Sequence, residues 1–72
     1  MKSEELVRMA NQIADFFSGY PEDEAVAGIA GHIRDFWEPR MRADLARIVA
    51  AGGDGLRPQA LAAARQVVGQ AD

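Results

Sequence analysis

The chain has 72 residues and no cysteine, and this combination limits its possible folds more than any other feature. A chain of this length forms one domain at most and buries only about 60% of the surface that its unfolded form exposes. Many domains of this size depend on disulfides or a structural metal, but without cysteine there are no disulfides, thiolate catalysis or cysteine-ligated metal sites. We therefore expect a single domain over residues 1–72 that depends on close packing or on a partner protein.

Charge and hydropathy narrow the classes of function. The net charge is −3, whereas dedicated nucleic-acid binders normally have a basic balance or a strongly basic face. No stretch approaches the roughly 18 to 20 apolar residues of a membrane span, and the N-terminus lacks the apolar stretch of a signal peptide. We expect no nucleic-acid partner, no membrane and a cytoplasmic location.

Apolar residues recur at helical spacing in four segments, and no segment shows the alternation of a strand. The predicted helices span residues 3–18, 21–37, 39–51 and 58–68. Ser3 is placed to cap the first helix, Pro21 with the acids after it begins the second, and Pro39 begins the third. The pattern predicts an all-α fold, a small domain of three to four short helices.

The sequence indicates clearly where the third predicted helix ends, but it gives a weaker signal for the fourth. Three glycines between Ala51 and Gly55 provide the left-handed residues that end a helix. The segment after Pro58 is rich in alanine and has only Leu61, Ala64 and Val68 as a thin apolar stripe. We expect this last helix to be partly frayed or to dock on a partner.

The inventory of reactive side chains is too small for an enzyme. His32 is the single histidine, and it has only Asp35 as an acidic neighbour on its helix, which is a weak metal pair. Ser3 and Ser18 are explained by helix ends, so no Ser-His-acid arrangement has natural components. The glycines after Ala51 lack the Lys-Ser/Thr of a phosphate-binding loop. We predict no catalytic, cofactor-binding or metal-binding residues on this chain.

The segment from Gly31 to Arg42 is unusually dense in residues that favour protein interaction. It holds the single histidine, the single tryptophan and three of the seven arginines, and tryptophan and arginine are enriched at interaction hot spots. The predicted partner-binding residues are His32, Phe36, Trp37, Pro39, Arg40 and Arg42. The charges are also divided along the chain: residues 1–30 carry two basic and six acidic side chains, and residues 31–65 carry six and four.

Each of these residues also has a purely structural interpretation. Trp37 and Phe36 would close the core where the second and third helices meet, and His32 would support helix packing. Arg40 and Arg42 would form surface pairs with Glu38 and Asp44. Elsewhere, the adjacent Phe16 and Phe17 cannot both point into one core, so we expect one of them to be available to a partner.

Two blocks of sequence carry a resemblance to a known family. Residues 6–17 read LVRMANQIADFF, and residues 25–42 read AVAGIAGHIRDFWEPRMR. The second block, with His32-Ile33, Phe36-Trp37-x-Pro39-Arg40-Met41-Arg42 and then Ala51-Gly52-Gly53-x-Gly55-Leu56, is specific in residue type and spacing. Over about residues 5–58 the chain resembles the delta subunit of cytoplasmic NAD-dependent formate dehydrogenase. The tail after Pro58 matches only loosely.

The resemblance implies a place in a multi-subunit enzyme. In that family the alpha subunit oxidises formate at a molybdenum or tungsten bis-pterin guanine dinucleotide centre, and iron–sulfur clusters pass electrons to FMN and NAD on other subunits. The delta subunit, which has no redox centre, would dock on and stabilise the catalytic alpha subunit and its molybdenum cofactor site, alongside beta and gamma subunits. Two alternatives stay open: a transient maturation chaperone that assists cofactor insertion, and a helical module that associates with itself.

Overall fold

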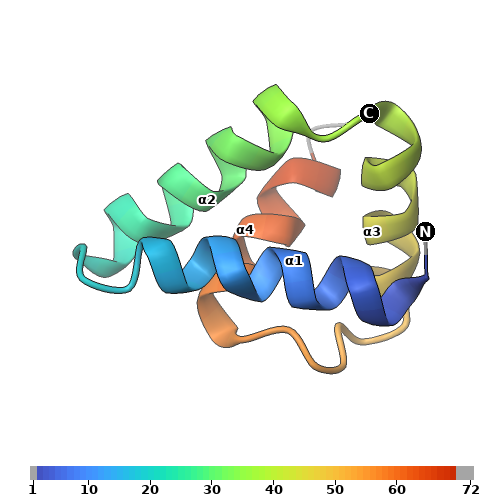
Figure 1. Ribbon diagram of the computed structural model, residues 1–72, viewed down its shortest axis with the longest axis horizontal. Helices are drawn as coiled ribbons and strands as arrows, with labels where there is room; N and C mark the ends of the chain where they lie inside the picture. Colours follow the sequence, from blue (N-terminus) through green and yellow to red (C-terminus); the bar gives the residue numbers. More distant parts are fainter. Residues whose placement is uncertain (1, 70–72) are drawn as a thin grey trace.

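The computed structural model describes residues 2–69, and its regular elements are four helices (Figure 1). They are α1 (Ser3–Phe16), α2 (Glu22–Phe36), α3 (Pro39–Ala50) and α4 (Pro58–Gly69). No strand occurs within residues 2–69, so the predicted all-α class is confirmed and the predicted helix ends agree to within two residues. The radius of gyration is 10.8 Å, close to the roughly 11 Å expected of a compact chain of this length.

The start of α1 differs from the prediction. Lys2 is the N-cap residue, and its carbonyl oxygen accepts hydrogen bonds from the N–H groups of Glu5 and Leu6. Ser3 is already the first helical residue and makes no side-chain cap, so the predicted capping role is wrong. The reason is that the helix begins one residue earlier than the hydroxyl requires, and Glu4 and Glu5 instead complement the positive helix end.

A sharp corner separates α2 from α3, as the sequence predicts. Trp37 and Glu38 are both extended, with ψ angles of 134° and 154°, and Pro39 occupies the first turn of α3. The proline ring disfavours helical geometry at the residue before it, and its own fixed φ suits the start of a helix. The corner therefore ends one helix and begins the next with only two residues between them.

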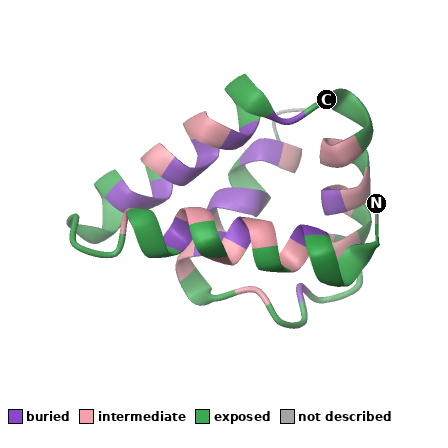
Figure 2. Cartoon of the chain, viewed as in Figure 1, coloured by how far each residue is buried: buried purple, intermediate pink, exposed green. Residues whose placement is uncertain are grey.

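The last helix, α4, lies at the centre of the domain. It packs against all three other helices, most extensively against α2 and α3, which hardly meet each other directly (Figure 1). Buried residues lie along α1, α2 and α4 on the sides where these helices meet (Figure 2). The buried residues of α4 are Ala60, Ala63, Ala64 and Val67.

The prediction for this segment is correct only in part. The helix is continuous to Gly69, and of the predicted stripe Ala64 is fully buried, whereas Leu61 and Val68 are half-buried and Ala60, Ala63 and Val67 complete the buried face. The physical reason is the small size of alanine, which lets neighbouring helices approach closely and fill the interior at the density of an organic crystal. Alanine has little weight in a hydrophobicity pattern, so the pattern underestimates how deeply an alanine-rich helix is buried.

The connection between α3 and α4 has the predicted left-handed glycines. Gly52, Gly53 and Gly55 have φ angles of 113°, 72° and 88°. Gly53 is buried, and a Cβ atom there would lie 2.5 Å from Cδ1 of Leu61. This glycine is required both by its backbone conformation and by the close approach of α4.

Asn11 on α1 holds this connection in place, a role that the sequence did not indicate. Its amide nitrogen donates to the carbonyl oxygen of Gly55 at 2.9 Å, and its amide oxygen accepts from the N–H of Arg57, also at 2.9 Å. Arg57 forms an ion pair with Asp15, one turn further along α1. The side chains of α1 thus fix the residues that lead into the central helix.

Replacing Asn11 with alanine should lower the free energy of unfolding by about 1–2 kcal/mol, because two hydrogen bonds between distant segments are lost at once. Urea unfolding followed by the fluorescence of Trp37 measures this change. The neighbouring exposed Gln12 is the control, and Gln12→Ala should stay within about 0.5 kcal/mol of the unaltered chain. Equal unfolding midpoints for the two variants would contradict the role of Asn11.

Candidate functional site

An open groove of about 440 Å³ lies between α1 and the end of α2. The two helices meet at the turn over residues 17–21 and diverge from it (Figure 1). We call this hollow the aromatic groove. Its lining residues are Met9, Gln12, Ile13, Phe16, Phe17, His32 and Trp37.

The wall that α1 contributes comes from a second apolar stripe on that helix. Leu6, Ala10 and Ala14 recur every four residues and are buried in the core. Met9, Ile13 and Phe16 form a neighbouring stripe with helical spacing, and it lies on the groove. Helix α1 is therefore apolar over a wider arc than burial in the core requires.

Two aromatic side chains, one lining this groove and one in contact with a lining residue, are strongly exposed. Phe16 is 76% exposed and meets Phe17 edge to face, with the ring centroids 5.2 Å apart. Phe36 is 72% exposed and lies against the ring of His32, with a centroid separation of 4.7 Å. Phe36 therefore extends the aromatic surface from the groove along α2.

Phe17, unlike Phe16, packs against the core. It is half-buried against the core and sits so close to Gly28 of α2 that a Cβ atom there would lie 2.5 Å from its ring. The expectation that only one of the adjacent phenylalanines points inward is confirmed. The absence of a side chain at Gly28 makes room for Phe17 and leaves Phe16 on the surface.

Trp37 belongs to the core, with 5% of its surface exposed. It follows α2 in extended conformation, and it is buried where it also lines the aromatic groove. The burial corresponds to the structural interpretation of Trp37, as the residue that closes the core at the corner. Its ring is far less exposed than the rings of Phe16 and Phe36.

The structure separates the predicted partner-binding residues into two places. His32 and Trp37 line the aromatic groove, and Phe36 adjoins it through His32. Pro39 and Arg42 line a second hollow of about 430 Å³, and Arg40 is exposed and lines neither. We call the second hollow the arginine groove; its lining residues are Arg34, Pro39, Arg42, Ala43, Ala46, Val67 and Val68.

The arginines do not form the surface pairs considered as an alternative. Asp44 forms its ion pair with Arg47, one turn further along α3, rather than with Arg42. Within residues 2–69 neither Arg40 nor Arg42 is part of an ion pair. Arg34 also lines the arginine groove and was not among the predicted partner-binding residues. It comes two residues after His32, so it lies on another face of α2.

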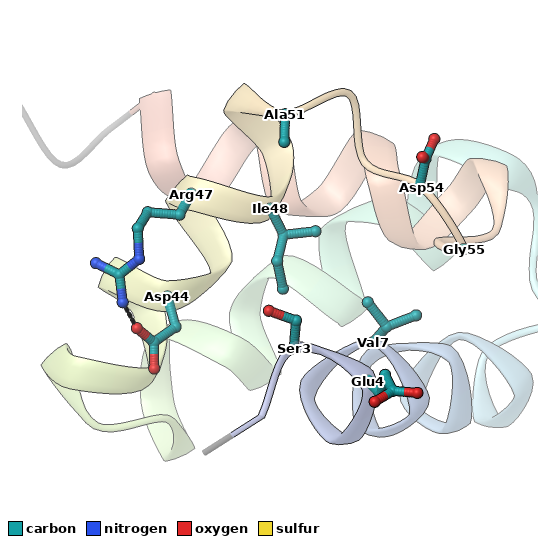
Figure 3. A pocket seen from close by; sticks show the side chains of 9 residues that line it. All are labelled: Ser3, Glu4, Val7, Asp44, Arg47, Ile48, Ala51, Asp54 and Gly55. Atoms are coloured by element: carbon teal, nitrogen blue, oxygen red, sulfur yellow. Dashed lines mark ion pairs between the residues drawn. The ribbon is translucent and has the colours of Figure 1, made fainter.

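In another hollow, of about 650 Å³, the reactive side chains do not converge on one point. It lies between the start of α1, the end of α3 and the following loop (Figure 3). Ser3 and Ile48 face one another across it, while the carboxylates of Glu4, Asp44 and Asp54 lie at separate edges (Figure 3). Among residues 2–69 no three histidine, aspartate or glutamate side chains are grouped so that they could hold a metal ion. In the same range no helix has the length and apolar character to cross a membrane.

Fold and surface together define a small all-α domain whose surface includes an aromatic groove and a groove lined by arginine. Residues 5–64 match the family described as the NADH-dependent formate dehydrogenase delta subunit FdsD, and the chain belongs to this family. The match extends into α4, beyond the blocks that carry the resemblance in the sequence. No curated protein and no solved structure gives a significant match to the chain.

Proposed function

We propose that this chain is a non-catalytic subunit that docks on the catalytic alpha subunit of formate dehydrogenase through the aromatic groove and stabilises it. One observation carries the proposal: the domain has a complete core, yet Phe16 and Phe36 remain more than 70% exposed beside a groove. Large exposed apolar side chains beside a groove are typical of protein interaction sites, and aromatic anchors that become buried there supply much of the binding energy.

The groove suits an apolar segment of a partner. Met9, Ile13 and Phe16 offer aliphatic and aromatic surface from α1, and the half-buried His32 adds a polar ring at the opposite wall. An inserted aliphatic or aromatic side chain would lose its contact with water, and the imidazole would remain available for a hydrogen bond. This combination of an apolar centre and a few polar groups is common to binding pockets.

Membership of the delta subunit family supports the choice of partner. The first partners to consider for a subunit of a formate dehydrogenase are the other subunits of that enzyme. We propose that the molybdenum or tungsten centre, the iron–sulfur clusters, FMN and NAD all belong to those other subunits. This chain then contributes binding energy. It stabilises the state of the alpha subunit to which it binds more tightly.

Two other functions use the same surface. A maturation chaperone would bind the immature alpha subunit through the groove and leave after cofactor insertion. A self-associating module would pair the groove with that of a second copy, in a symmetric contact. These alternatives differ from the proposal in stoichiometry, so one measurement separates them.

The test is native mass spectrometry of the complex recovered through a tag on this chain, with metal analysis of the same sample. We expect one copy of the chain per alpha subunit in active enzyme that is replete with molybdenum or tungsten. Recovery mainly with a metal-poor, inactive alpha subunit would support the chaperone instead. Recovery only as a homo-oligomer would overturn docking on the alpha subunit.

A further inference from the structure

The arginine groove lies on a different part of the surface from the aromatic groove, and the two share no lining residue. Arg34 comes from the last turn of α2 and Arg42 from the first turns of α3. Val67 and Val68 of α4 and Ala46 of α3 provide an apolar base. Two arginines and an apolar surface thus line one hollow at the junction of three helices.

One hydrogen-bond donor of Arg42 has no partner among the described residues. Its Nε is buried without a hydrogen-bond partner, and it is the only such buried side-chain atom within residues 2–69. An unsatisfied buried donor is costly, whereas a hydrogen bond from a charged donor to a carboxylate is among the stronger ones in proteins. Arg42 as a whole is half-buried, so part of its side chain is accessible to an acceptor from outside.

In the part of the chain that the structure describes, neither arginine of the groove is paired with an acidic side chain, although Asp35 and Glu38 are close to them in sequence. The ion pairs within residues 2–69 join Arg47 to Asp44 and Arg57 to Asp15, so neither involves a groove arginine. Residues 31–65 carry six arginines and four acids, whereas residues 1–30 carry two basic and six acidic side chains. The groove therefore belongs to the basic part of an acidic chain, and it is complementary to an acidic ligand.

We propose that the arginine groove binds an acidic segment of the partner protein, in which a carboxylate pairs with Arg34 and Arg42 and an adjacent aliphatic side chain covers Val67 and Val68. A guanidinium group can hold a carboxylate through two parallel hydrogen bonds, and this gives direction as well as strength. The apolar base explains why the ligand is a protein segment, since an isolated anion such as phosphate would leave that base uncovered. This second contact rests on the proposed function, because it assumes that the alpha subunit is docked.

Cross-linking in the assembled complex tests the proposal. The chain has a single lysine, Lys2, so Arg34→Lys and Arg42→Lys each place a new amine in the groove. A carbodiimide joins an amine to a carboxylate only when the two are in contact. We expect an amide link between the new lysine and an aspartate or glutamate of the alpha subunit, located by peptide mass spectrometry. Arg8→Lys on α1 is the control and should give no such link.

A second measurement uses charge reversal and does not depend on the reach of lysine. Arg34→Glu with Arg42→Glu should weaken binding to the alpha subunit by about 10-fold or more, with helicity unchanged, whereas Arg8→Glu should have little effect. A complex that forms normally, with neither cross-link nor weakened binding, overturns the acidic contact and leaves the proposed function standing. Failure of the unaltered chain to form a complex overturns both.

Discussion

Replacing Ala63 with aspartate is expected to unfold the domain. Ala63 is fully buried on α4, the helix that packs against all three others. An unpaired charge at such a position costs about 3–5 kcal/mol, and the larger side chain adds steric strain. A domain of this length has a total stability of about 4–11 kcal/mol, so this single change removes most of it.

Circular dichroism and the fluorescence of the buried Trp37 measure the outcome. We expect loss of both helical signal and native fluorescence at room temperature. Gln66, exposed on the same helix, is the matched control, and Gln66→Asp should leave both signals unchanged. If Ala63→Asp instead kept the native fluorescence and melted only residues near α4, the central position of α4 would be wrong.

Replacing both Phe16 and Phe36 with serine should weaken binding to the alpha subunit by at least about 30-fold, which corresponds to the 2 kcal/mol that defines one interaction hot spot. Both rings are largely exposed, so their loss should change the free energy of unfolding of the isolated chain by no more than about 0.5 kcal/mol. The effect therefore appears in the complex and not in the fold. Surface plasmon resonance with the immobilised alpha subunit measures the affinity.

Tyr20→Ser provides the control for this prediction. Tyr20 is an exposed aromatic residue, 51% accessible, that packs near Phe17 but does not line the aromatic groove. Its replacement should leave the affinity nearly unchanged. Equal losses of affinity for Tyr20→Ser and for the double variant would show that exposed aromatic surface in general, rather than the groove, drives the association.

The candidate site could be predicted only in part from the sequence. The density of histidine, aromatic and arginine residues between Gly31 and Arg42 directed attention to that segment. On α1 the exposure of one phenylalanine was predicted, but the part of Met9 and Ile13 was not, because they carry the same signal as core residues when a helix is considered alone. Trp37 and Phe36, adjacent in sequence, differ in exposure because the backbone turns from helix to extended structure between them.

The amino-acid sequence by itself determined the local structure of this protein: the helical class, the proline that begins α3 and the left-handed glycines before α4. These features depend on residues that are close together in the chain, and their preferences act before any tertiary contact forms. The tertiary structure alone decided that alanine-rich α4 is central, that Asn11 holds the loop before it, and that His32 and Arg42 lie in different grooves. These outcomes depend on how closely helices distant in sequence can approach, and the sizes of side chains on several helices set that distance together.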